Sequence, residues 1–559
     1  MRIVGKCFRY FNTVKYLKTS QIFYQVHHKR KRKKDISQYS VSEITFSPYQ
    51  LFIETLDGEP DYADRFELEQ LVNGTLKLLH ESTHFPYGTW NLDEKSHLWN
   101  FNLHYLEYCV ALVSKYRSTG ETKYKETIEN ILKDWLDYGL HASDAVNAYT
   151  ISLRLVNCLI VLSVLYTEMD KALKKRLILS LYSQYRWLLC NTEKHLLGNH
   201  YLENLKAIVI GSLYFGEENI YHKYVNMFLQ ELNEQILPDG FHFELSVMYH
   251  KIILEDLIRV GLVLKETERT EYRQVVQYIE KMCSALKNME DGISRTPLFN
   301  DSGDNIAKSS SSLLGTSEIL FGLKMKRLSK NIYLKESGYY RYNRSNYIII
   351  IDCGRIGPDY IPGHGQCDCL SYELYLNQLP FIVNSGTYQY QGRMRKYFRS
   401  VYAHNTVVID GKEQSEVWGE HRVARRISSI IAKPQAVSFE GGYRAYHGGR
   451  HSRFFDISDA GIRILDYVSN VKEGCSIQSF VHLSPGVTAE FERNAVALYM
   501  GNKKAAILNP IECNVHIHRS GWLCNYAPDF GKLETGVCLE FIWLNDRNSH
   551  GYTLDFINI

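Results

Sequence analysis

The chain has 559 residues, of which 45% are hydrophobic and 23% are charged, and its formal net charge is +3. This length exceeds what a single hydrophobic core usually serves, so we expect two or more domains. The composition is that of an ordinary globular protein, and the small net charge argues against a dedicated nucleic-acid-binding protein.

The first 40 residues form a basic N-terminal segment. Its densest part is His28-Lys29-Arg30-Lys31-Arg32-Lys33-Lys34, which we expect to be a solvated arm, with contact to an anionic membrane surface or glycan as alternatives. Residues 1–24 lack the apolar core and cleavage site of a secretory signal, and no apolar run of about 18 residues is present. The sequence therefore predicts no transmembrane segment and a cytoplasmic location, with periplasmic and membrane-associated locations as alternatives.

Residues from about 65 to 325 carry apolar side chains at helical spacing. Typical stripes are Leu103, Leu106, Val110 and Val113, and further along the chain Ile253, Leu257, Val260 and Leu264. Such stripes pack on neighbouring helices, and short polar connections between them favour helical hairpins. We expect a helical domain over residues 41–328.

The pattern changes after residue 335. Tyr347-Ile348-Ile349-Ile350-Ile351 is short and β-branched, as a buried strand should be, and Thr406-Val407-Val408-Ile409 ends at the hairpin signal Asp410-Gly411. Many short strands separated by turn residues predict an antiparallel β-sandwich over residues 329–559. Helices first and strands afterwards indicate separate domains in an α+β chain.

Two predicted helix starts carry side chains suited to proton transfer. Asn199 and His200 open one helix, where Asn199 is a natural N-cap and His200 shares a helix face with Glu203. Tyr249 stands near the start of another helix and could donate or accept a proton. Each cluster taken alone is more often structural than catalytic.

A third cluster lies in the predicted sheet region. His364 stands between Gly363 and Gly365, and glycines permit close approach of a ligand to the backbone. Arg399 and His404 follow downstream, where the chain enters another strand. Two histidines in loop-to-strand positions of one sheet region favour a site more than either does alone.

Other motifs of catalysis are missing from the sequence. It contains no Gly-rich phosphate loop, G-x-S-x-G elbow or H-E-x-x-H pair, which weakens nucleotide-dependent, esterase and metalloprotease interpretations. The 12 cysteines are scattered without a disulfide framework, so we expect free thiols.

Longer stretches of sequence are more specific than these single motifs. Residues 357–426 contain Gly363-His364-Gly365, Leu370-Ser371-Tyr372-Glu373-Leu374, Val383-Asn384-Ser385-Gly386-Thr387, Ala403-His404-Asn405-Thr406-Val407-Val408-Ile409-Asp410-Gly411 and Gln414-Ser415-Glu416-Val417-Trp418-Gly419. Upstream stand Leu98-Trp99-Asn100-Phe101-Asn102-Leu103-His104-Tyr105, Gly198-Asn199-His200 and Phe299-Asn300-Asp301-Ser302-Gly303-Asp304. Together they closely resemble the heparinase II/III family of polysaccharide lyases.

The resemblance implies a fold and a reaction. The fold would be an incomplete (α/α) toroid, like that of alginate lyases, followed by an antiparallel β-sandwich, with a cleft between them. The reaction would be β-elimination at a uronic acid of an anionic polysaccharide. It requires neutralisation of the carboxylate, a base for the C5 proton and an acid for the leaving oxygen.

The resemblance also implies roles for individual residues. Asn199 and His200 would hold the substrate carboxylate, and Tyr249 and His364 would be the acid–base pair in an order that depends on the substrate. Glu203 would hold or tune His200. The remaining expected substrate-binding residues are Arg399 and His404, which would shape the sandwich side of the cleft, and Tyr402, which is an alternative phenol for proton transfer.

The sequence departs from the family at a structural zinc site. Many members have a histidine where Gln366 stands, and some have an aspartate where Asn384 stands; only His404 of that ligand trio remains here. Neutral amides are poor zinc ligands, so we expect no metal and no other cofactor. Cys367 and Asp368 are weaker alternatives as ligands.

Three alternatives to a lyase stay open. A uronate C5-epimerase would use the same proton abstraction on the same fold, and a non-catalytic glycan-binding protein of a capsule or exopolysaccharide pathway would use only the cleft. A glycoside hydrolase would need two suitably spaced carboxylates. The candidates for that pair are Asp239, Glu244, Asp301 and Asp304.

Overall fold

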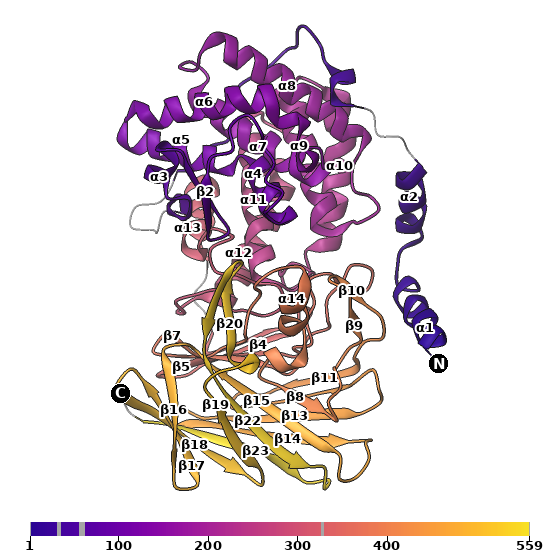
Figure 1. Ribbon diagram of the computed structural model, residues 1–559, viewed down its shortest axis with the longest axis vertical. Helices are drawn as coiled ribbons and strands as arrows, with labels where there is room; N and C mark the ends of the chain where they lie inside the picture. The colour runs from indigo at the N-terminus through magenta and orange to yellow at the C-terminus, as the bar shows by residue number, and fades with distance from the viewer. Residues whose placement is uncertain (1, 31–34, 55–61, 326–328, 558–559) are drawn as a thin grey trace.

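The computed structural model describes residues 2–30, 35–54, 62–325 and 329–557. A helical part and a sheet part follow one another along the long axis of the molecule (Figure 1). The predicted α+β order, with helices first and strands afterwards, is confirmed. The proposed boundary at residue 328 lies outside the described residues.

The helical part is built from amphipathic helices that pack on their neighbours in chain order. Central among them is α7, which contacts α4, α5, α8 and α9. The helices are α3 (Leu68–Val72), α4 (His97–Tyr105), α5 (Glu107–Thr119), α6 (Thr122–Tyr138), α7 (Ala148–Leu165), α8 (Lys171–Cys190), α9 (Gly198–Tyr214), α10 (Glu218–Gln235), α11 (Val247–Glu266), α12 (Tyr272–Glu290) and α13 (Ser310–Phe321), with a hairpin of β1 (Thr75–Leu78) and β2 (Glu81–His84) before α4.

Helix α7 bears on the expectation that no segment spans a membrane. Among the described residues, α7 is the one helix that is long and apolar enough to cross a membrane. The search of the sequence for an apolar run did not identify it. However, 72% of it is buried inside the fold. Its neighbours on several sides account for that apolar character, as in the core helix of a globular domain.

The sheet part consists of two large antiparallel sheets that share one apolar core. The first has the order β11 (Ser428–Pro434), β12 (Ser438–Arg444), β13 (Arg450–Ile457), β14 (Gly461–Ser469), β23 (Ser549–Phe556), β18 (Lys503–Ile511), β17 (Ala495–Met500) and β16 (Val487–Glu492). The second has the order β19 (Asn514–His518), β22 (Val537–Leu544), β15 (Ser476–Leu483), β7 (Leu379–Ile382), β6 (Tyr372–Leu376), β5 (Tyr347–Asp352), β4 (Tyr339–Asn343) and β3 (Asn331–Leu334).

Shorter elements complete the sheet part. They are α14 (Gly392–Phe398), β8 (Val407–Ile409), the pair β9 (Val417–Trp418) and β10 (Arg422–Val423), and the pair β20 (Asn525–Asp529) and β21 (Lys532–Thr535). The turn at Asp410-Gly411 closes with a single bridge, Ile409 to Lys412, and the ladder partner of β8 is β15. The predicted hairpin is therefore only a tight turn.

The basic N-terminal segment forms α1 (Arg2–Val14) and α2 (Thr19–Arg30), which run beside both parts of the molecule (Figure 1). Of the basic run that was expected to be a solvated arm, Lys29 and Arg30 are exposed at the end of α2. Trp418 Nε1 in the sheet part donates to Thr13 Oγ1 at 3.0 Å, and Gln21 Nε2 donates to Leu196 O in the helical part at 3.1 Å. Residues 31–34 of the basic run lie outside the described residues.

A buried arginine connects the two large sheets. Arg453 on β13 forms a two-pronged ion pair with Asp466 on β14 and donates to Ser479 Oγ on β15 in the other sheet at 3.0 Å. It also donates to the backbone oxygens of Leu370 and Asn405. None of the Arg453 or Asp466 side chain is exposed, so this pair stabilises the junction only while both members are present.

We expect Arg453→Met to lower the free energy of unfolding by about 3–5 kcal/mol, because Asp466 would stay buried without its partner. The exposed Arg463 on β14 offers a matched control, and Arg463→Met should change stability by less than about 0.5 kcal/mol. Urea denaturation followed by tryptophan fluorescence measures both. Equal midpoints for the two variants would contradict this role.

Candidate active site

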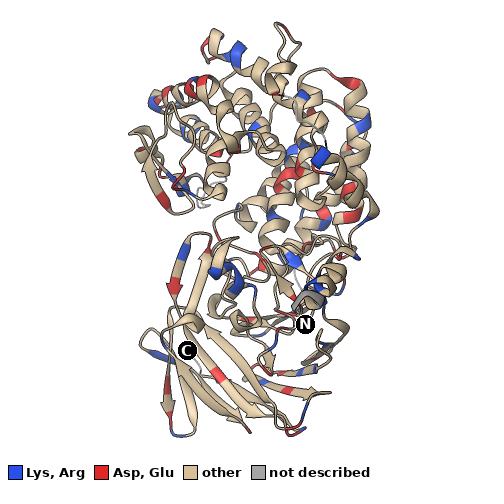
Figure 2. Cartoon of the chain, turned by 45° about the vertical axis from the view of Figure 1, so that its right-hand side comes forward, with Lys and Arg blue, Asp and Glu red and all other residues tan. Residues whose placement is uncertain are grey.

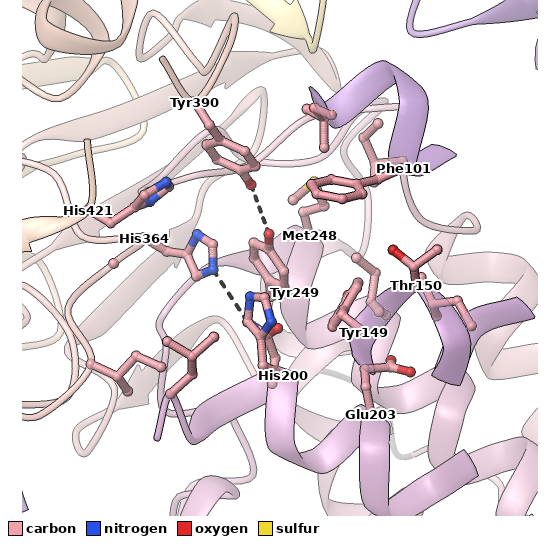
Figure 3. A pocket seen from close by; sticks show the side chains of 18 of the residues that line it. Phe101, Tyr149, Thr150, His200, Glu203, Met248, Tyr249, His364, Tyr390 and His421 are labelled. Atoms are coloured by element: carbon pink, nitrogen blue, oxygen red, sulfur yellow. Dashed lines mark hydrogen bonds between the residues drawn. The ribbon is translucent and has the colours of Figure 1, made fainter. Parts of the chain in front are cut away.

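A cavity of about 880 Å³ lies where the helical part, the sheet part and the two N-terminal helices meet. Its size suits a bound oligomer, since ligand sites usually occupy roughly 300–1,000 Å³. Figure 3 shows side chains from both parts turned into it, among them His200, Tyr249, His364, Tyr390 and His421. The four predicted catalytic residues, Asn199, His200, Tyr249 and His364, all line this one space.

Asn199 lies in the first turn of α9, but it does not cap the helix as predicted. The N-cap position is Leu197 and carries no side-chain cap. Instead, Asn199 Nδ2 donates to Glu244 Oε2 at 2.7 Å and lies 3.3 Å from His364 Nε2. Gly198 permits this arrangement, because a Cβ there would lie 2.5 Å from Glu244 Oε1.

Tyr249 is positioned by the start of α11. Ser246 caps this helix, accepting from the Tyr249 backbone N–H at 3.2 Å and donating to Asp301 O at 2.6 Å. The Tyr249 hydroxyl lies 2.8 Å from that of Tyr390, which follows β7 in the sheet part. Burial raises the pKa of Tyr249 well above its ordinary value, so the phenol is protonated at neutral pH.

His364 is held between two carboxylates. Its Nδ1 lies 3.0 Å from Asp301 Oδ2, its Nε2 lies 3.5 Å from Glu244 Oε2, and its ring centroid is 4.0 Å from that of Tyr249. Asp301 is in turn bound by Arg395 on α14. Burial alone would raise the pKa of Asp301, but Arg395 and His364 together outweigh it and hold that pKa far below its usual range.

His200 has a different carboxylate partner from the predicted one. Its Nδ1 lies 3.3 Å from Glu193 Oε1, while Glu203 pairs with Lys206 at 2.5 Å. Burial alone would lower the pKa of His200, but Glu193, Glu244 and Glu203 together outweigh it, with Glu193 the largest of the three, so the pKa is raised. Glu203 lines the cavity and acts on His200 only as a more distant charge.

Three predicted substrate-binding residues do not line the cavity, and we correct their role to support of the sheet part. Arg399 is buried, with Nε donating to Gly365 O at 3.1 Å. Tyr402 packs against Phe480 and Trp522. His404 is fully buried, with Nδ1 3.0 Å from Asn384 Oδ1.

The residues at the zinc position do not fit the metal. Gln366 Nε2 donates to Asp301 Oδ1 at 2.8 Å, and Asn384 Oδ1 accepts from Ser371 and faces His404. The donor set contains one imidazole and two neutral amides, and the described residues hold no group of three His, Cys, Asp or Glu side chains placed to bind a metal. Cys367 and Asp368 are therefore not part of such a group, and Gln366 serves to position Asp301.

Sequence reasoning missed several residues of the site. Tyr390 and His421 line the cavity, while Glu193 and Arg395 position His200 and Asp301. Local spacing gives no signal for them, because each meets its partner only through the tertiary fold. The sequence suggested that Gly365 permits close approach of a ligand. A Cβ at Gly365 would lie 1.8 Å from Ile356 O, so this glycine makes room for protein backbone and not for a ligand.

We expect Glu193→Gln to lower the pKa of His200, because it removes the largest contribution that raises it. Since the folded-state pKa is raised, this pair stabilises the fold fully below pH about 6.5 and loses that effect as pH rises through the folded-state pKa. A histidine NMR titration measures the change, with Glu126→Gln on the exposed face of α6 as control. An unchanged His200 titration in Glu193→Gln would refute the pairing.

Comparison with known proteins places this geometry in a family. Residues 71–320 match the family model "Heparinase II/III N-terminus", and residues 326–542 match "Heparinase II/III-like, C-terminal". The curated heparin-sulfate lyase of Pedobacter heparinus is 22% identical over 380 residues, which cover 59% of this chain and 55% of that protein. The match therefore spans about half the length of this relative.

Solved structures support the same fold. Heparinase III has a TM-score of 0.68 at 16% identity, covering 93% of this chain and 88% of that one. A mutant of heparan sulfate lyase HepC from Pedobacter heparinus has a TM-score of 0.60 at 16% identity, with coverages of 96% and 88%. Chondroitin AC lyase from Streptomyces coelicolor A3, in complex with chondroitin sulphate, has a TM-score of 0.51 at 9% identity, with coverages of 90% and 80%.

Identities this low show the fold alone, and the fold is the helical toroid followed by an antiparallel β-sandwich that the sequence resemblance implied. The two family models together cover most of the chain, from residue 71 to residue 542. The chain belongs to the heparinase II/III family.

Proposed function

We propose that this protein is a polysaccharide lyase that cleaves a uronic-acid-containing polysaccharide by β-elimination. The observation that carries the proposal is the meeting of Asn199, His200 and Tyr249 from the toroid with His364 from the sandwich in one cavity. The similarity to known polysaccharide lyases supports this activity at the level of the family.

Asn199 and His200 would neutralise the uronate carboxylate. One amide hydrogen of Asn199 is taken by Glu244, which leaves the second directed to the side of His364. The raised pKa of His200 favours its cationic form, which would attract a carboxylate. Withdrawing charge from that carboxylate makes the neighbouring C5 proton more acidic, as the elimination requires.

Tyr249 and His364 would transfer the two protons. Their rings are in contact at 4.0 Å, so one sugar ring can reach both groups at once. Tyr249 is protonated at rest, and its contact with Tyr390 offers a second hydroxyl through which a proton can move. Which of the two takes the C5 proton depends on the configuration of the uronate.

We expect the substrate to be an anionic polysaccharide. The names of the relatives point to sulfated glycosaminoglycans as the first class to test. No cofactor is needed for this chemistry. An epimerase would use the same four residues and return the proton from the opposite face, so reaction products separate the two functions.

The geometry disfavours a glycoside hydrolase. Asp239, Glu244, Asp301 and Asp304 do not line the cavity. Glu244 and Asp301 are engaged with His364, and Asp304 faces Arg295 at 3.2 Å. Glu244 and Asp301 therefore support the histidine, and none of these four carboxylates is placed in the cavity to flank a glycosidic bond.

We expect Tyr249→Phe and His364→Ala each to lower kcat by about 100-fold or more, because each removes an acid–base group. The assay follows ultraviolet absorbance of 4,5-unsaturated ends with heparan, chondroitin, hyaluronan, alginate and bacterial capsule as substrates. Tyr402→Phe is the matched control: it removes a hydroxyl outside the cavity and should leave kcat within about twofold of the wild type.

Equal loss in Tyr402→Phe would contradict the placement of the site. Absence of unsaturated ends together with Tyr249-dependent deuterium exchange at C5 would replace the lyase by the epimerase. Polysaccharide binding with neither reaction would favour the non-catalytic alternative.

A further inference from the structure

The N-terminal segment that includes α1 and α2 carries a net positive charge that the rest of the chain does not. Residues 1–34 contain eleven Lys and Arg residues and no Asp or Glu, whereas the whole chain has a net charge of only +3. The remainder of the chain is therefore net acidic. These residues also lie outside both family matches, which begin at residue 71.

Polar side chains of both helices contact the rest of the protein. On α1, Arg9 Nε contacts Glu416 Oε1 at 2.9 Å and Thr13 accepts from Trp418. On α2, the buried Gln21 donates to Leu196 O and Tyr360 O. The polar sides of the helices are thus fixed against both domains.

Their apolar side chains face solvent instead. Phe11 and Phe23 are each 65% exposed, and Phe8, Ile22 and Val26 are between 41% and 53% exposed. An amphipathic helix of a globular protein normally turns its apolar side to the core. Here the orientation is inverted, and Lys29 and Arg30 extend the same exposed side of α2.

We propose that α1 and α2 form a docking surface for an anionic lipid bilayer. Such a bilayer supplies both complements at once: an acyl boundary for Phe11 and Phe23, and negative headgroups for the cations around them. An anionic polysaccharide would satisfy the cations but would leave the phenylalanine side chains in water. The combination of exposed aromatic rings with the exposed cations Lys29 and Arg30 therefore selects lipid.

Docking in this way would fix the position of the cavity relative to the membrane. Tyr10, Thr13, Gln21 and Gln25 line the same cavity as His364 and Tyr249, so the helices form one of its walls. Figure 2 turns toward the viewer the side of the molecule that carries α1 and α2 in Figure 1. The cavity would open beside the lipid surface, whereas lipid binding itself does not depend on the proposed lyase activity.

The test is cosedimentation of the full chain, without substrate, with phosphatidylcholine vesicles containing about one third phosphatidylglycerol, against pure phosphatidylcholine vesicles. We expect binding to the anionic vesicles, with about tenfold or greater loss in Phe11→Ser/Phe23→Ser. Lys29→Gln/Arg30→Gln should lose roughly thirtyfold at low salt, and binding of the wild type should fall in high salt.

Two matched double variants control for general loss of surface apolarity or charge. Phe491→Ser/Leu544→Ser replaces equally exposed apolar residues on the sandwich, and Lys171→Gln/Lys175→Gln removes cations from α8. Both should bind vesicles like the wild type. Failure of the wild type to bind anionic vesicles would overturn the proposal. So would unchanged binding of Phe11→Ser/Phe23→Ser, because contact through charge alone is what a soluble polyanion would also give.

Discussion

The buried ion pair between Asp301 and Arg395 is the constraint on which the site depends. Asp301 belongs to the loop between α12 and α13, Arg395 lies on α14, and neither side chain is exposed. The same carboxylate orients His364 and accepts from Gln366. One residue thus joins the two domains and fixes the imidazole. Removal of either partner would leave a charge buried, and removal of Asp301 would also release the histidine.

Close backbone packing adds to this constraint. Gly365 faces the Ile356 carbonyl and Gly198 faces Glu244 at distances that no Cβ could occupy. The loop that carries His364 and the first turn of α9, which carries Asn199, are therefore held by their neighbours before any ligand arrives. Preorganisation of this kind suits a reaction in which four groups must meet one sugar ring.

The sequence predicted the elements well because apolar spacing is a local property. The stripe that includes Leu257 becomes α11, and the Tyr347 run becomes β5. Partner choice was not local: Glu193 and Glu203 both lie within reach of His200 in sequence, and only tertiary packing directs Glu203 to Lys206. The clearest failure concerned His404, which keeps a family motif while serving the interior of the sandwich.

The charge distribution explains how a chain that is net acidic outside its N-terminal helices could accept a polyanion. The carboxylates that line the cavity have cationic partners: Glu203 and Asp256 share Lys206, Glu107 pairs with Arg65, Glu255 with Arg259 and Asp359 with Arg426. His200, whose raised pKa favours the cation, and the lining residue Arg422 add positive charge to the site. Exposed charges are screened over about 8 Å at physiological salt, so longer-range attraction must come from cations at the cavity wall. The basic N-terminal helices stand at that wall.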